Sequence, residues 1–251
     1  MMSTAHGNDD TIVRPEGKLS PVISVVNLRK MYKLGDQDIT ALDGITFNVF
    51  PGEFVTIRGP SGCGKSTLLH MITLMDKPDS GTIEINGENV SGLNKKQQAL
   101  IRAKNIGFVF QDFNLIDHLT AQENVEIAVG AAGERKSSVR REKAVEALKR
   151  FSLQDRLKNR PIQMSGGQKQ RVAIARALVN DPGIIVADEP TGNLDSKNVK
   201  MVLDLLTELN QVDGRTVIIV THEDDVSRIG TRKIMMSDYK IISDTGSKIG
   251  A

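Results

Sequence analysis

Apolar and polar positions follow two patterns along this chain. In Val22–Leu28 and Ile45–Phe50 they alternate, as they do in half-buried strands, and Glu53–Arg58 is a third strand candidate. Gly183–Asp188 and Thr216–Thr221 are almost uninterrupted apolar runs, which are typical of parallel strands buried on both faces. Two further segments with strand-like sequences are Thr82–Asn86 and Ile106–Phe110.

Helical segments separate these strands. The segments Lys65–Met75 and Ser196–Asn210 are predicted helices with approximate ends. The helical spacing of Ala144 and Leu148 indicates an amphipathic helix, with the charged residues Arg140–Lys143 largely on its solvated face. An alternation of strand, helix and strand implies a parallel sheet with right-handed crossovers, in which a ligand binds at the carboxyl ends of the strands.

The composition limits the class of protein. With 251 residues, of which 39% are hydrophobic and 25% charged, the chain is expected to form one large soluble domain or two small ones. A net charge of +2 argues against a nucleic-acid partner. A single cysteine, Cys63, rules out an internal disulfide and suits a reducing cytoplasm.

The ends of the chain differ from its middle. Residues 1–20 are mostly small and polar, which predicts a flexible tail without the apolar stretch of a signal peptide. An ordered domain is expected over residues 21–244, followed by a C-terminal tail over 245–251. The sequence has no apolar run near the ~18–20 residues that cross a bilayer, so no direct membrane span is expected.

A glycine-rich loop lies between the strand candidate that ends at Arg58 and the helix predicted from Lys65. It matches the pattern G-x-x-x-x-G-K-[ST] in full. In this pattern backbone N–H groups surround phosphates, Lys65 reaches the β- and γ-phosphate oxygens, and Ser66 supplies an oxygen to Mg²⁺. Cys63 is either a small residue in a tight turn or a redox-active thiol. The expected phosphate-binding residues are Gly59, Pro60, Ser61, Gly62, Cys63, Gly64, Lys65, Ser66 and Thr67.

Two adjacent carboxylates end one of the apolar runs. Asp188 is expected to hold Mg²⁺, usually through water, as the second metal-binding residue of a phosphate-loop NTPase. Glu189 is then free to orient or deprotonate an attacking water. Taken alone, Glu189 also fits a solvated acidic turn, but the phosphate loop favours the interpretation as a hydrolytic site.

A second phosphate-binding helix start lies far from the first along the chain. In the octet Met164–Arg171, Ser165 and two glycines expose backbone N–H groups at the mouth of a helix, and apolar residues recur at helical spacing after it. A helix N-terminus favours a phosphate because of its partial positive charge and unpaired donors. A single nucleotide can therefore contact one helix start from one chain and the other helix start from a second chain.

These motifs occur in an order that resembles the ATP-binding cassette (ABC) ATPases, over about Val22 to Asp244. The resemblance implies an α/β fold of the P-loop NTPase class, the ABC ATPase fold. Its core sheet is mostly parallel and flanked by helices, and it has an antiparallel β subdomain and an α-helical subdomain at about residues 112–165. It also implies ATP and Mg²⁺ as cofactors, and hydrolysis of ATP coupled to transport.

The resemblance implies roles for single residues. Tyr32 resembles the aromatic residue that stacks on adenine, although an ordinary surface tyrosine is the alternative. Asp195 resembles the aspartate of the D-loop, which crosses a dimer interface. The implied catalytic residues are Glu189, His222 and Gln111, and the implied metal ligands are Ser66, Gln111 and Asp188. The implied signature residues, which contact the γ-phosphate of ATP on the partner subunit, are Ser165, Gly166, Gly167 and Gln168.

The resemblance further implies partners. The hypothesis is that two copies close head to tail around two ATP molecules, each site combining one chain's phosphate loop with the other's signature. A permease on a separate chain would receive the motion, which places this protein in the cytoplasm, peripheral on the cytoplasmic face of the membrane. Phe113, Leu115 and Ile116 either supply an apolar groove for that permease or belong to the core.

The branch of the family is suggested by short segments. Gly107–Gln111 and Thr191–Asp195 are similar to the branch of lipoprotein-releasing, macrolide-exporting and cell-division ATPases. This favours export or extraction of a peptide, lipoprotein or drug-like cargo. The alternative is a nucleotide-gated regulator of a membrane complex, of the cell-division type, without cargo. An ABC ATPase of DNA repair fits poorly, because the chain has no heptad run and only one cysteine.

Overall fold

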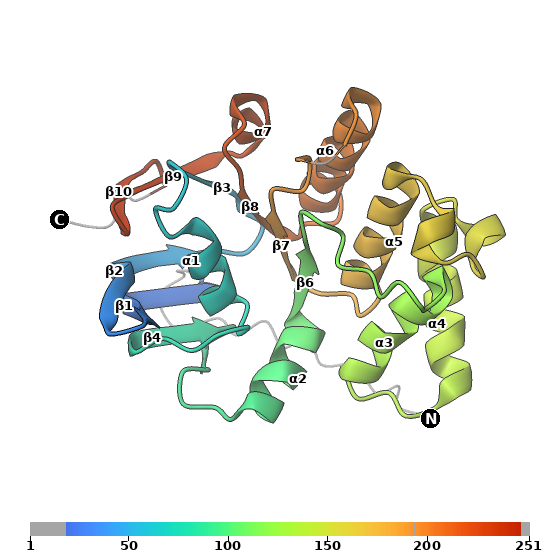
Figure 1. Cartoon of the computed structure of the whole chain (residues 1–251), viewed down its shortest axis with the longest axis horizontal. Coiled ribbons are helices and arrows are strands. Elements are labelled where there is room, and N and C mark those ends of the chain that lie inside the picture. Colours follow the sequence, from blue (N-terminus) through green and yellow to red (C-terminus); the bar gives the residue numbers. More distant parts are fainter. Residues whose placement is uncertain (1–18, 193, 247–251) are drawn as a thin grey trace, which may run out of the picture.

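Two β-sheets organise residues 19–192 and 194–246, which this computed structural model describes (Figure 1). The smaller sheet has the strand order β2-β1-β4-β5 and the larger one β10-β9-β3-β8-β7-β6. The expected tails, residues 1–20 and 245–251, lie almost wholly outside the described residues. Both the mostly parallel core sheet and the antiparallel β subdomain are confirmed.

The smaller sheet is antiparallel throughout. Its strands are β1 (Ile23–Leu34), β2 (Gln37–Val49), β4 (Ser80–Ile85) and β5 (Glu88–Asn89). The alternation in the sequence matches its two faces, since Ile23 and Val25 are buried while Ser24 and Val26 are more exposed. The β1–β2 hairpin extends beyond the predicted strands to Leu34, through residues that are exposed apart from the buried Lys30.

The larger sheet is parallel except at one edge, where β10 pairs antiparallel with β9. Its strands are β3 (Phe54–Arg58), β6 (Ile106–Val109), β7 (Ile184–Asp188), β8 (Thr216–Val220), β9 (Arg232–Ser237) and β10 (Lys240–Asp244). The apolar runs of β7 and β8 are buried on both faces, as predicted. Ile184 and Val186 belong to one core, and Ile185 and Ala187 to the other.

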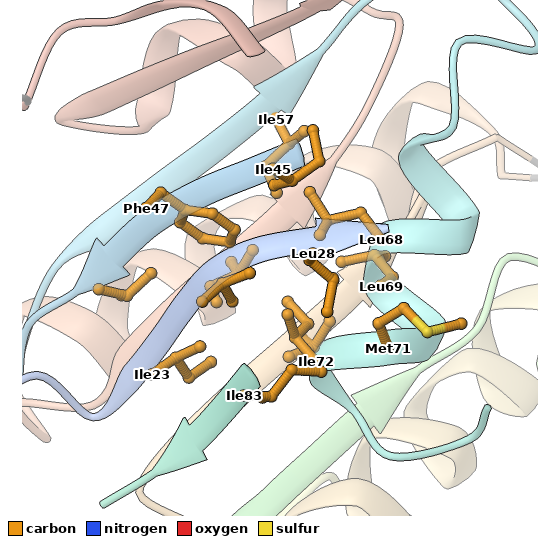
Figure 2. Close-up of a cluster of buried hydrophobic side chains, with 14 of the residues drawn as sticks. Ile23, Leu28, Ile45, Phe47, Ile57, Leu68, Leu69, Met71, Ile72 and Ile83 are labelled. Atoms are coloured by element: carbon orange, nitrogen blue, oxygen red, sulfur yellow. The ribbon is translucent and has the colours of Figure 1, made fainter. Parts of the chain in front are cut away.

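Helix α1 (Lys65–Ile72) lies between the two sheets. Its side chains Leu68, Leu69 and Ile72 are fully buried and pack with residues of β1, β2 and β4, as Figure 2 shows. The same core includes Ile57 of β3 and Ile218 of β8. Burial on both sides fixes this helix, and with it the loop that precedes its first residue.

The opposite face of the larger sheet packs against α5 (Gly166–Leu178), α6 (Ser196–Gln211) and α7 (Asp224–Ile229). Helices α3 (Ala121–Ala131) and α4 (Ser137–Arg150) pack against α5 and against each other. Figure 1 shows α3, α4 and α5 gathered on the side of the molecule away from β1 and β2. Between residues 112 and 165, all of which are described, the structure is α3, α4 and two short 3-10 turns at Gln154–Arg156 and Pro161–Gln163.

Several elements differ from the sequence predictions. Helix α1 ends at Ile72 rather than near Met75, because Leu74 adopts a left-handed backbone with φ 57. Helix α2 (Lys95–Asn105) and the hairpin of β9 and β10 were not predicted. Among the described helices, none is long and apolar enough to cross a membrane.

Arg232 ties the β9–β10 hairpin to both sheets. Its guanidinium pairs with Asp244 Oδ2 at 2.6 Å and with Glu53 Oε2 at 2.8 Å, and it donates to the carbonyl oxygen of Asn48 at 2.7 Å. Burial opposes its charge, but the hydrogen bonds and charges of Asp244 and Glu53 raise the pKa of Arg232. The hairpin is therefore held firmly beside β3.

Candidate functional site

Four neighbouring parallel strands end at one edge of the larger sheet. Gly59 follows β3 and Glu189 follows β7 directly, while His222 comes two residues after β8 and Gln111 two residues after β6. Since the strand order is β3-β8-β7-β6, these residues come from adjacent strands. The prediction that the motifs lie at the carboxyl ends of the strands is confirmed.

The loop from Gly59 to Gly64 has a backbone that requires glycine at both ends. Gly64 has φ 100, and a methyl group on its Cα would overlap the carbonyl oxygen of Ala41. Gly59 has φ 155, and a methyl group there would overlap the carbonyl oxygen of Met236. The loop is thus closely packed between β2 and β9, with Gly64 as the N-cap of α1.

Two side chains stabilise the loop from within. Lys65 Nζ donates to the carbonyl oxygens of Gly59 and Pro60, each at 2.8 Å. Cys63 is 4% exposed, and its sulfur would lie 2.7 Å from a methyl group on Gly59. Cys63 therefore occupies the place of a small residue in a tight turn.

A cavity of about 630 Å³ opens above this loop. The loop and the two strand ends form a polar part of its walls, the β1–β2 hairpin forms an apolar part, and Tyr239 of the β9–β10 turn adds a ring beside the loop. The lining residues are Tyr32, Ile39, Thr40, Ala41, Ser61, Gly62, Gly64, Lys65, Ser66, Thr67, Glu189, His222 and Tyr239. The cavity can accommodate a molecule with an anionic end and an apolar ring.

Tyr32 presents its ring to this cavity while its hydroxyl bonds elsewhere. The hydroxyl donates to Asp76 Oδ2 at 3.0 Å, and Lys30 Nζ lies 5.0 Å from the ring centroid. Burial, together with Asp76, raises the pKa of the Tyr32 phenol. The ring is thus fixed at the apolar end, at the place from which it can stack on a planar group.

Asp188 lies beside the first residues of α1, with its carboxylate close to the Ser66 hydroxyl. Burial and the charge of Glu189 raise the pKa of Asp188, although Ser66 and Lys65 oppose that shift. A hydroxyl and a carboxylate oxygen are the ligand types that Mg²⁺ prefers. The described residues contain no group of three His, Cys, Asp or Glu that could hold a metal, so such an ion would also need water or ligand oxygens.

Glu189 is held in an unusual conformation next to His222. Its φ is 43, and its backbone N–H donates to the carbonyl oxygen of Val220 at 2.9 Å. Its Oε1 lies 2.9 Å from His222 Nδ1. A left-handed backbone at a residue other than glycine is strained, and such strain concentrates at functional sites. The pair can position a water molecule at the polar end of the cavity.

Gln111 lies apart from the cavity walls. Its Nε2 would lie 3.1 Å from a methyl group on Gly192, so its side chain is packed beside the segment that follows Glu189. The structure brings Gln111 to the correct strand edge but not into the lining of the cavity.

Ser165 is the N-cap of α5, as predicted for a helix start. Its Oγ accepts from the N–H of Gln168 at 3.3 Å, and Gln168 Oε1 accepts from the N–H of Ser165 at 3.0 Å. Gly166 has open space around it. The residues that line the cavity do not include Ser165–Gln168, so this helix start faces a different place.

Asn198 joins the helix start to Asp195. Asp195 is the N-cap of α6, and its Oδ2 accepts from Asn198 Nδ2 at 2.8 Å. The Asn198 side chain also fills the space where Gly167 would carry a methyl group. Hydrogen bonds from the backbone and side chain of Asn198 lower the pKa of Asp195. Asn198 therefore links the exposed Asp195 to the buried Gly167 behind the helix start.

The sequence did not reveal several of these contacts. Tyr239 lines the cavity from a turn that contains no glycine, so no hairpin was predicted around it. Asn198 gave only a weak signal, as a polar residue three positions after the capping aspartate. Phe113 is half-buried, Leu115 packs against the second core, and Ile116 is 36% exposed. This trio is thus part core and part surface.

A family model described as "ABC transporter" matches residues 42–192. An ABC transporter ATP-binding protein of Methanocaldococcus jannaschii, MJ0796, is 48% identical over 223 residues, which cover 88% of this chain and 95% of that protein. The ABC transporter ATP-binding protein YknY of Bacillus subtilis is 44% identical over 88% of this chain and 95% of its own length.

Two further matches add to these. The macrolide export ATP-binding/permease protein MacB of Hyphomonas neptunium is 46% identical over 92% of this chain, but the match spans 36% of that protein. A solved structure of MJ0796, described as a dimeric post-hydrolysis state bound to ADP and Pi, has a TM-score of 0.81 and 46% identity. It covers 88% of this chain and 97% of the other.

Proposed function

The chain belongs to the ABC transporter family as an ATP-binding subunit with ATPase activity, and we propose that it powers a membrane permease on a separate chain. The role of ATP in this proposal rests mainly on the cavity above the phosphate loop, which joins a phosphate-binding end to Glu189 and His222. Relatives of similar length are named ATP-binding proteins, and MacB is named an ATP-binding/permease protein.

ATP occupies the cavity in this proposal. The loop from Gly59 to Thr67 binds the phosphates, and Tyr32 stacks on adenine at the apolar end. On binding, Lys65 exchanges its bonds to the loop carbonyls for bonds to phosphate oxygens. That exchange keeps its ammonium group paired in both states.

Hydrolysis requires a water molecule and a divalent cation. Ser66 and Asp188 would hold Mg²⁺ directly or through water. Gln111 would be a further ligand after its side chain turns away from Gly192. The ion would neutralise negative charge on the phosphates. Glu189 accepts a proton from the attacking water or orients it. His222 holds Glu189 Oε1 and lies beside the γ-phosphate.

Two copies close head to tail around two ATP molecules. The helix start at Ser165 exposes N–H groups but lies outside its own chain's cavity, so the γ-phosphate that it binds belongs to the other copy. Asp195, linked to Gly167 through Asn198, approaches the same interface. The dimeric state of the related MJ0796 structure supports this arrangement. Loss of the γ-phosphate then opens the dimer.

The permease places this subunit on the cytoplasmic face of the membrane, and the cargo is a peptide, lipoprotein or drug-like molecule that is exported or extracted. The name of the MacB relative supports this class of cargo. The test is to purify the tagged protein from detergent-solubilised membranes of its source and identify what remains bound. A permease that delivers cargo to reconstituted vesicles only with ATP supports the proposal. A membrane complex that transports nothing, but changes its binding to a cell-wall hydrolase with ATP, supports the regulator instead.

A further inference from the structure

Two tyrosines line the cavity, and their hydroxyl groups differ in what they bond. The hydroxyl of Tyr32 donates to Asp76 Oδ2 at 3.0 Å. The hydroxyl of Tyr239 makes no hydrogen bond within the part of the chain that the structure describes. The Tyr32 hydroxyl is thus engaged by Asp76, whereas Tyr239 brings to the cavity wall a ring and a hydroxyl without a partner among the described residues.

The backbone of Tyr239 is strained. Asp238 and Tyr239 form the two-residue turn between β9 and β10, with φ values of 48 and 66. Turns of this kind favour glycine, because a side chain at positive φ crowds the backbone. A tyrosine in this position is consistent with a function that its side chain performs.

The turn is fixed against β2. The carbonyl oxygen of Tyr239 accepts from the N–H of Asp43 at 2.9 Å. In addition, Lys240 Nζ lies 3.1 Å from Asp43 Oδ2. Tyr239 is half-buried, so its side chain has a restricted choice of positions along the cavity wall.

Sheet order places Tyr239 at the phosphate-loop end of the cavity. The phosphate loop follows β3, whose neighbours are β9 on one side and β8 on the other. The turn after β9 therefore flanks the loop across from His222. Tyr32, in contrast, pairs with Ile39 near the tip of the β1–β2 hairpin.

We propose that the Tyr239 hydroxyl donates a hydrogen bond to an oxygen of the nucleotide's phosphate chain, an inference that rests on the proposed function of this cavity. A phenol O–H bonded to an anionic oxygen forms a charge-assisted hydrogen bond. Tyr239 then supplies a second side-chain donor to the phosphates, on the side of the loop opposite Glu189.

The test measures binding of two probes by calorimetry, ADP and inorganic tripolyphosphate. Tyr239→Phe keeps the ring and the backbone but removes the donor, so it should raise the Kd of both probes about 5- to 10-fold. Tyr32→Ala should weaken ADP and leave tripolyphosphate unchanged, because its ring meets the base. If Tyr239→Phe weakens ADP alone, or neither probe, the assignment to the phosphates is wrong.

Two controls separate this inference from the proposed site. Asp238→Gly relieves strain in the same turn at an exposed residue outside the cavity lining, and should leave both Kd values unchanged. Lys65→Ala should abolish binding of both probes. If Lys65→Ala binds them like the wild type, the proposed nucleotide site is wrong; if it fails to bind while Tyr239→Phe binds normally, only the role of Tyr239 is wrong.

Discussion

His222 Nδ1 lies 2.9 Å from Glu189 Oε1, so the residues that follow β8 and β7 meet in one hydrogen bond above the phosphate loop. His222 is mostly exposed, with 63% of its side chain accessible, while that of Glu189 is 22% accessible. The more buried carboxylate is therefore held by a partner at the surface. A substitution of His222 therefore alters how the Glu189 carboxylate is positioned without disturbing the buried core.

Replacing His222 by alanine should lower the rate of ATP hydrolysis roughly 100-fold, because Glu189 loses the group that orients it. Binding of ADP should stay nearly unchanged, since the loop and Tyr32 are intact. A coupled assay of phosphate release measures kcat. His118→Ala, at an exposed histidine outside the cavity lining, is the matched control and should hydrolyse ATP at the wild-type rate. Equal rates for both variants would contradict the role of His222.

Asp188→Asn should stabilise the nucleotide-free protein near neutral pH. Burial and Glu189 raise the pKa of Asp188 in the folded protein above its ordinary value of 3.8. The folded state therefore binds this proton more tightly than the unfolded state does, and the resulting stability is lost as pH rises through the raised pKa. The Tm advantage of the asparagine variant should grow over that pH range and then level off. Parallel Tm curves across the range would show that the carboxylate is not destabilised by burial.

The main elements of both sheets follow from the pattern of apolar residues. Strands β7 and β8 are buried on both faces, which is why their runs are continuous, and the half-buried strands of the smaller sheet alternate. The motifs at their ends were placed correctly because parallel strands bring successive carboxyl ends to one edge.

Elements without an apolar pattern were missed. Helix α2 buries one residue, Gln98, so it has almost no apolar face. Its start could have been found from the capping box of Asn94 and Gln97. The β9–β10 hairpin lacks the glycine that normally marks such a turn, and its stability comes from the distant partners of Arg232. Contacts between residues far apart in the sequence are not visible in local patterns.

Gly64→Ala should destabilise the fold and abolish nucleotide binding. Its new methyl group would overlap the carbonyl oxygen of Ala41, and its φ of 100 is unfavourable for alanine. Together these effects cost about 3 kcal/mol or more of unfolding free energy. Gly62→Ala is the matched control, because nothing lies within 4 Å of its added methyl group. It should lose only about 1–2 kcal/mol from backbone strain. Urea unfolding compares the two, and equal losses would contradict the close packing at Gly64.

Asn198→Ala should weaken ATP-dependent dimerisation while leaving ADP binding unchanged. The variant removes the bond to Asp195 Oδ2 and leaves a gap beside Gly167, both of them outside the cavity. Loss of one hydrogen bond corresponds to roughly fivefold weaker association. Sedimentation at several protein concentrations measures it, with Lys200→Ala as a control at an exposed residue of the same helix. A loss of ADP affinity in Asn198→Ala would show that Asn198 acts at the nucleotide cavity rather than at the dimer interface.

The proposed assembly is a pair of chains in which each copy completes the nucleotide site of the other. Its most direct test is size-exclusion chromatography of Glu189→Gln with Mg²⁺ and ATP, since this variant keeps the phosphate loop and cannot accept the proton of the attacking water. The predicted result is a dimer with ATP and only a monomer with ADP. The double variant Glu189→Gln/Lys65→Ala should remain a monomer with ATP. A Glu189→Gln protein that binds ATP and still elutes only as a monomer would rule out this assembly.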